Sequence, residues 1–240
     1  MPSGQIETLD EIEAAWRKAE RESDKRALWR VFARGGWFRA CREAGQKGDQ
    51  ATLEVWLGAN NATRQDIIQF NGVEAAQMVR THLLCGLLAC QTQGFARPER
   101  QKALREAVAS LVVPVGFCSD LIQEFLGELP RQAERELSLT VFLVDTVRNE
   151  GVVAVLTLEL LPEGSGGLYP IPEQAFIRDP DFCQAEDNAR AYVAETGLWR
   201  EDQDVRWRLQ RRDGKPLANL SGPSLGAAFA LGIGKLLARE

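Results

Sequence analysis

The feature of this sequence that most constrains its fold is a change in the spacing of apolar residues near residue 137. Before it, apolar residues recur at three- and four-residue intervals, which is typical of amphipathic helices. After it, the runs 137–147 and 151–161 are rich in β-branched and apolar residues, which favours strands. We therefore expect an α+β protein: an N-terminal helical domain over 1–135, followed by an α/β segment over 137–240.

Helix signals and breakers divide the first part. The expected helices span about 9–32, 37–45, 49–58, 73–92, 98–113 and 118–129. Asn60-Asn61 predicts a turn, Pro98 suits a first helical turn, and Pro114 ends a helix. The residues 73–92 are mostly apolar, so this helix should lie near the centre of a bundle. The tryptophans expected to pack the bundle are Trp16, Trp29, Trp37 and Trp56.

The second part reads as a hairpin followed by alternating elements. The two strand-like runs are joined by the short, Gly-containing segment 148–151, which predicts a β-hairpin. A Gly-rich loop at 164–170 follows, then a helix at 182–197, a strand at 204–209 and a helix at 223–240. In the strand, Val205 and Trp207 alternate with Arg206 and Arg208, so we expect the arginine face to be solvated.

Composition excludes several classes of protein. Over 240 residues, 45% are hydrophobic and the net charge is −5, which argues against disorder and against a broad nucleic-acid surface. The apolar runs are too short to cross a bilayer, and the polar N-terminus lacks a signal peptide. Five cysteines without CxxC spacing and one histidine predict free thiols and no zinc site. We expect a cytoplasmic protein with no cofactor, no metal and no nucleic-acid or membrane partner.

One local motif indicates chemistry: Gly222-Pro223-Ser224-Leu225-Gly226, at the expected start of the last helix. If Pro223 occupies the first helical position, Ser224 lies in the first turn, beside free N–H groups and the positive end of the helix dipole. That setting suits a nucleophile with an oxyanion site, and the motif fits G-x-S-x-G loosely. The alternative is an ordinary helix start whose small residues permit close packing.

The surrounding order of elements adds a family resemblance. From about 152 to 237 the chain resembles the first half of the Lon-type serine peptidase domain: a strand, a Gly-rich turn, a helix, a strand and a motif that opens the next helix. The family's D-G-P-S-A-G is similar to residues 221–226, with Ser221 and Leu225 as departures. The resemblance implies a partial Lon-like fold, shared with ribosomal S5-like domains. It also implies Ser224 as nucleophile, with backbone support from Gly222, Pro223, Leu225 and Gly226.

The general base is where the chain departs from this family. Lon-type peptidases pair the serine with a lysine from the second half of the domain, beyond Glu240 here. Lys235 lies eleven residues further along the same helix, roughly 16 Å from Ser224 by helical rise. Lys215 could approach only if its loop folded back, and His82 is expected to pack within its helix. We therefore expect a lysine from outside this chain.

Three explanations remain open: a piece of a longer protein, half of a split peptidase, or a degenerate fold retained for binding. The first two predict a serine endopeptidase that cleaves protein or peptide substrates, with an ATPase or a second-half peptidase subunit as partner. The third predicts a non-catalytic interaction or regulatory module that binds a partner protein. The last helix is apolar almost all round, so we expect either a sticky face or a partner over it.

Overall fold

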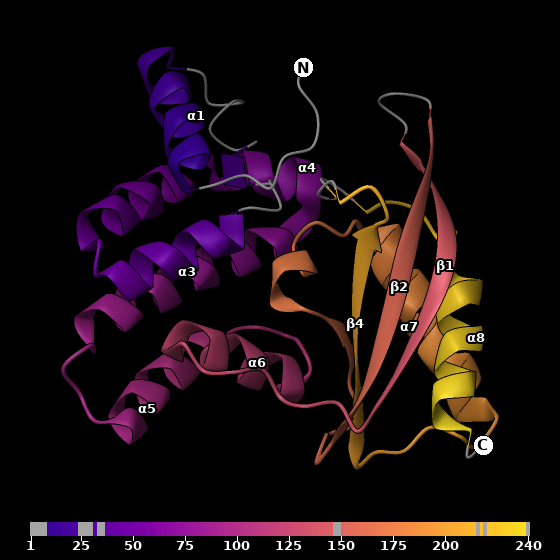
Figure 1. The fold of residues 1–240 in the computed structure, drawn as a ribbon. Helices are drawn as coiled ribbons and strands as arrows, with labels where there is room; N and C mark the ends of the chain where they lie inside the picture. Colours follow the sequence, from indigo (N-terminus) through magenta and orange to yellow (C-terminus); the bar gives the residue numbers. More distant parts are fainter. Residues whose placement is uncertain are drawn as a thin grey trace.

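The protein has an α+β fold, as the change of period predicts. The computed structural model describes residues 9–23, 31–32, 37–145, 150–214, 217 and 220–238. Figure 1 shows the N-terminal helices on one side of the molecule and a four-stranded sheet with two helices on the other. Within the described residues, no helix has both the length and the apolar character needed to cross a membrane.

The N-terminal part contains a very long helix. The described helices are α1 (Leu9–Arg21), α3 (Trp37–Lys47), α4 (Gln50–Gln91), α5 (Arg97–Val108) and α6 (Val115–Leu126). Helices at 37–45 and after Pro98 are confirmed, but the expected turn at Asn60-Asn61 is wrong. Asn60 is only 1% exposed, because it lies on the buried stripe of α4. The members of this stripe are Leu53, Trp56, Asn60, Thr63 and Ile67.

The interruption in α4 falls instead at Gly72, whose φ of 88° and ψ of 169° are not helical. A positive φ costs glycine little because it has no Cβ. On the N-terminal side, Asp49 caps α4: its carboxylate accepts a hydrogen bond from the Thr52 backbone N–H at 3.2 Å. The long helix is therefore two helical segments that meet at a glycine.

Aromatic residues fill the core of the helical part. Trp37 contacts Phe32 at 4.5 Å and Trp56 at 4.9 Å between ring centroids, and Trp16 packs on Phe32 at 5.6 Å. Three of the four expected tryptophans thus lie in this core. Trp29 lies outside the described residues.

The sheet has the order β1-β2-β4-β3. Its strands are β1 (Arg135–Asp145), β2 (Glu150–Pro162), β3 (Leu168–Pro170) and β4 (Gln203–Arg211). β1 with β2 and β2 with β4 are antiparallel, whereas β3 runs parallel to β4. The hairpin is confirmed, with Leu139 opposite Leu156. Of the expected turn at 148–151, residues 148 and 149 lie outside the described residues, and residues 150 and 151 belong to β2.

Two helices, α7 (Pro180–Glu195) and α8 (Gly226–Leu237), pack on the same face of the sheet. A short 3₁₀ helix, η1 (Pro172–Gln174), precedes α7. Trp207 of β4 lies 5.8 Å from Phe182 of α7 and 5.3 Å from Phe229 of α8 between ring centroids. Burial of this apolar surface is what holds the layers together. The expected sticky face on α8 is much reduced, because the sheet and α7 cover most of the helix; Leu231 is 67% exposed.

Two glycines of α8 predict opposite effects of the same substitution. A Cβ on Gly232 would lie 2.7 Å from the Leu139 Cδ1 atom of β1, whereas a Cβ on Gly234 would meet nothing within 4 Å. Gly232→Ala should lower the free energy of unfolding by about 1–3 kcal/mol through overpacking. Gly234→Ala should raise it by up to about 1 kcal/mol through helix propensity. Urea denaturation of both variants tests this, and equal effects would contradict the close approach of α8 to the sheet.

Candidate functional site

Ser224 lies just outside the helix that it was expected to open. α8 begins at Gly226, with Leu225 as its N-cap, so Pro223 and Ser224 precede the helix. The Gly226 backbone N–H donates to the Pro223 carbonyl at 3.0 Å, which closes a turn around the serine. Ser224 is exposed. The expected position of Ser224 in the first helical turn is therefore wrong, because the helix begins at Gly226, three residues after Pro223.

The Asp179 carboxylate bonds the backbone of Gly222, at the start of this turn. Asp179 accepts the Gly222 backbone N–H at 3.2 Å and also caps α7 by accepting the Phe182 N–H at 2.7 Å. Gly222 has a φ of 78°, which glycine adopts readily. One N–H expected to support an oxyanion is thus already bonded to an anion. The negative charge of Asp179 would also oppose a second negative charge nearby.

The candidate bases do not meet Ser224 within the described residues. Lys235 is exposed on α8, and Lys215 lies outside the described residues. His82 is fully buried in α4, where its Nδ1 bonds the Met78 carbonyl at 2.6 Å and its ring packs on Phe38, as expected for a core histidine. Burial lowers the pKa of His82 to about 4, so the ring is neutral at physiological pH.

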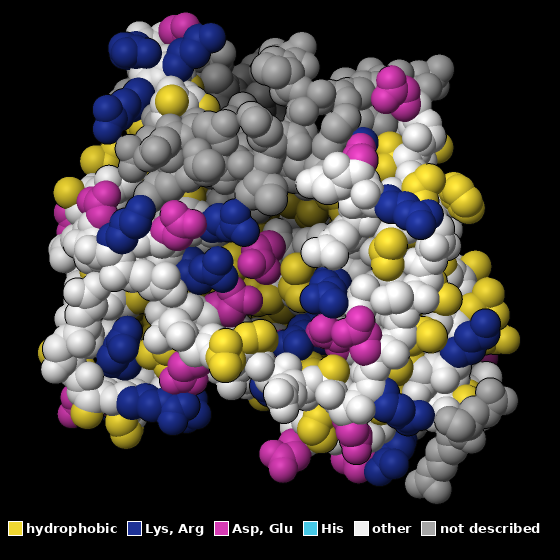
Figure 2. All heavy atoms as spheres, viewed as in Figure 1, with side chains coloured by type: hydrophobic (Ala, Val, Ile, Leu, Met, Phe, Trp, Pro, Cys, Tyr) yellow, Lys and Arg dark blue, Asp and Glu magenta, His cyan; other side chains and the backbone are white. Residues whose placement is uncertain are grey.

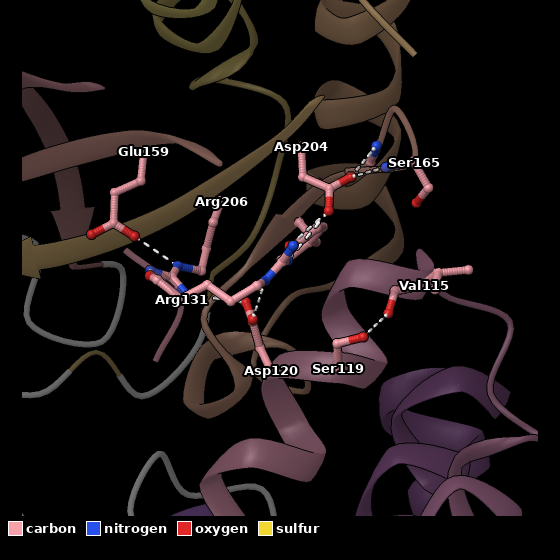
Figure 3. A network of polar contacts seen from close by, with 10 residues as sticks. Val115, Ser119, Asp120, Arg131, Glu159, Ser165, Asp204 and Arg206 are labelled. Atoms are coloured by element: carbon pink, nitrogen blue, oxygen red, sulfur yellow. Dashed lines mark hydrogen bonds and ion pairs between the residues drawn. The ribbon is translucent and has the colours of Figure 1, made fainter. Parts of the chain in front are cut away.

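A buried network of charges joins the helical part to the sheet, and Figure 3 shows its labelled members pointing toward one another. Arg206 of β4 donates to Glu159 of β2 at 2.7 Å and to Asp120 of α6 at 3.1 Å. Arg131, in the segment after α6, donates to the second oxygen of Asp120 at 2.8 Å. Asp120 therefore bridges two guanidinium groups that come from different parts of the chain.

Asp204 occupies the centre of this network and is 0% exposed. Its Oδ1 accepts the backbone N–H groups of Ser165 and Gly167, both at 2.9 Å. Its Oδ2 accepts from Arg131 at 3.2 Å and from the Tyr169 hydroxyl at 3.2 Å. The Gly-rich loop 164–170, whose composition suits a phosphate cradle, thus cradles a carboxylate of its own chain.

The network is satisfied internally, which indicates a structural role. Three carboxylates face the guanidinium groups of Arg131 and Arg206 and a tyrosine hydroxyl, and Glu159 also lies 3.9 Å from Arg208. Burial raises the pKa of Tyr169 above its usual range. The face in Figure 2 is hollowed between the helical part and the sheet, with acidic and basic side chains along the hollow. The expectation that Arg206 is solvated is wrong, because α6 covers that end of its strand face.

A second polar cluster joins α3, α6 and η1. Arg42 bonds Glu124 at 2.5 Å and lies 3.7 Å from Glu173. Burial, followed by the charge of Glu173, raises the pKa of Glu124 to about 7, although Arg42 acts in the opposite direction. Because one guanidinium group lies between two carboxylates, it offsets only part of their charge. Glu124 therefore keeps its proton to near-neutral pH.

A pocket of about 430 Å³ lies where α4 meets α7 and the segment between α5 and α6. Its walls include Met78 and Leu111, and its polar lining includes Glu74, Cys183 and Asp187. Arg178 also lines it, and its guanidinium bonds Glu186 at 2.5 Å. No group of three or more metal-binding side chains occurs in the described part of the chain.

Comparison with protein-family models, curated proteins and solved structures gives no match for this chain.

Proposed function

We propose that this protein is a non-catalytic interaction module that binds a partner protein by adding a strand to β1. The observation that carries the proposal is the edge position of β1, which pairs with β2 alone among the strands that the structure describes. Residues 137–144 of this strand contain no charged residue and no proline, which are the usual protections of an edge strand. An unprotected edge offers main-chain donors and acceptors to an incoming strand.

Side chains beside the edge support the same proposal. Phe142 is 78% exposed and Val144 is 69% exposed, both on the face opposite α8. Val153 of β2 lies directly opposite Phe142 and is half-buried. An added strand would cover these apolar groups while its backbone pairs with β1, so main-chain and apolar contacts would act together.

Peptide-bond hydrolysis through Ser224 is the second candidate, with a lysine from outside the chain as base. The exposed hydroxyl beside the start of α8 supports it. Asp179 weighs against it, because its carboxylate already uses the Gly222 N–H. Catalysis by the isolated chain is the least supported case, since a serine hydroxyl needs an adjacent base.

The two candidates are separated by one set of variants. The tagged chain is used to capture partners from the cells that produce it, with crosslinks mapped by mass spectrometry. Phe142→Lys with Val144→Lys should abolish a crosslink to 135–145, while Ser224→Ala and the control Tyr192→Lys should keep it. Tyr192 is exposed on α7, away from the edge.

The opposite result identifies the enzyme. Labelling of the chain by a fluorophosphonate probe, lost in Ser224→Ala, together with partner capture that is unchanged in the edge variant, would overturn the interaction module. Absence of labelling, with loss of capture in the edge variant, would support it.

A further inference from the structure

The pocket between α4 and α7 has an apolar interior and an open mouth. Met78 and Ala175 are buried in its walls, and Leu111 and Val113 close the side formed by the α5–α6 segment. At about 430 Å³, it falls within the range of sites that hold a small molecule or a large side chain. The interruption at Gly72 sets the direction of this wall, because the second segment of α4 starts there.

The charge around the pocket is negative. Glu74 and Asp187 are exposed in its lining, and neither forms an ion pair in the described structure. The one cation of the lining, Arg178, is neutralised by Glu186 at 2.5 Å, and its Nε donates to the Ala175 carbonyl at 3.1 Å. Glu74 and Asp187 therefore remain outside any ion pair, although the charge of Glu74 also acts on Arg178 through space.

The pKa of the Cys183 thiol depends on the same buried and charged surroundings. Burial raises its pKa to about 11, and Arg178 acts in the opposite direction. The carboxylates of Glu186, Glu74 and Asp187 add to the rise, which means that they act on the interior of the pocket. The site thus combines partial desolvation, which disfavours an anion, with three carboxylates that act against the single guanidinium of Arg178.

A long apolar stem that ends in a cation matches this arrangement. Lysine and arginine bury their methylene groups against apolar surface and keep the charged end near polar groups. Met78 and Leu111 would contact the stem, while Glu74 and Asp187 would receive the charge. Val73 and Val112, which are exposed in the pocket lining, would contact apolar residues on either side of the basic one.

We propose that this pocket binds a lysine or arginine side chain, flanked by apolar residues, from a partner protein. The occupant follows from charge complementarity between a basic side chain and the two unpaired carboxylates. That it belongs to a protein rests on the proposed function, and the pocket would then be a second contact site apart from β1.

Fluorescence polarisation with two labelled peptides tests this inference. Ala-Leu-Lys-Leu-Ala should bind the chain about tenfold more tightly than Ala-Leu-Glu-Leu-Ala. Glu74→Gln with Asp187→Asn should remove this difference. Glu99→Gln with Glu195→Gln removes the same charge from exposed positions outside the pocket and should leave it within about twofold. Equal binding of the two peptides by the unmodified chain would overturn the inference.

Cys183 supplies a second readout that locates the peptide. The lysine peptide should slow alkylation of Cys183 by iodoacetamide, while the half-buried Cys90 and Cys118, which are outside the pocket, should react at unchanged rates. Unchanged alkylation of Cys183 at saturating peptide would place the peptide elsewhere and contradict the inference.

Two further arms separate the alternatives. If n-hexylamine binds as tightly as the lysine peptide, the pocket takes a free amine and the protein occupant is wrong. The edge variant Phe142→Lys with Val144→Lys should bind the peptide normally, because it leaves the pocket unchanged. Loss of partner capture with intact peptide binding supports both proposals. Intact capture with intact peptide binding overturns only the strand addition.

Discussion

Replacement of Asp204 by asparagine should lower the free energy of unfolding by about 3–5 kcal/mol, because it removes one charge from a buried ion network. The carboxylate accepts four hydrogen bonds, from two backbone N–H groups, Arg131 and Tyr169. An asparagine NH₂ would face donors on one side, which leaves buried groups unpaired. Urea denaturation followed by circular dichroism measures the change.

The matched control lies two residues away. Asp202 forms an exposed pair with Arg200 at 2.7 Å, and exposed pairs contribute little to stability. Asp202→Asn removes the same charge and should change the free energy of unfolding by less than about 1 kcal/mol. Similar effects of Asp204→Asn and Asp202→Asn on the free energy of unfolding would show that the buried ion network does not stabilise the fold.

The second large effect is a pair of opposed pH dependences. The folded pKa of His82 is about 4, below its ordinary 6.5, so the unfolded chain binds more protons between these values. The stability from this neutral histidine is present above pH 6.5 and is lost as the pH falls toward 4. The shift corresponds to about 3 kcal/mol.

Glu124 acts in the other direction. Its folded pKa is about 7, above its ordinary 4.5, so the folded chain binds more protons between pH 4.5 and 7. Its contribution to stability is present below pH 4.5 and is lost as the pH rises through 7, by up to about 3 kcal/mol. Between pH 4.5 and 6.5 the two contributions nearly cancel in the unmodified chain.

Single substitutions should separate these two slopes. His82→Phe keeps a ring in the core and should leave a free energy of unfolding that falls, relative to the unmodified chain, as pH rises from 4.5 to 7. Glu124→Gln keeps an acceptor for Arg42 and should show the reverse, with acid sensitivity between pH 6.5 and 4. The measurement is urea denaturation at half-unit steps of pH. Curves parallel to that of the unmodified chain would contradict both assignments.

Local patterns in the sequence predict most of the helices and strands, but few of the contacts between them. The hairpin, α7, β4 and α8 lie close to their expected ranges, because alternation and capping are local signals. Asn60 fails as a turn residue because its spacing from Trp56 and Thr63 places it on a buried helical stripe. The energy of that packing outweighs the weak turn preference of asparagine.

In the candidate site, too, the sequence predicts the local turn but not the long-range contacts. Gly222, Pro223 and Ser224 form a turn before a helix, which the sequence indicates, but the role of Asp179 depends on a contact between residues 43 positions apart. The buried network is equally non-local, and Asp120 and Arg206 are 86 positions apart. A sequence signal existed in charged residues inside apolar runs, such as Glu159 in Thr157–Leu161. It does not identify their partners.

The buried network of charges between the helical part and the sheet has a consequence for how this protein can change over evolutionary time. Asp120 pairs with Arg131 within the helical part, and Glu159 pairs with Arg206 within the sheet. Two contacts join these pairs across the layers, Arg206 with Asp120 and Arg131 with Asp204. Recombination that exchanged residues 1–135 for a different helical domain would leave Arg206 without Asp120 and Asp204 without Arg131. The two halves are therefore expected to be inherited together, and substitutions at these positions should become fixed in compensating pairs.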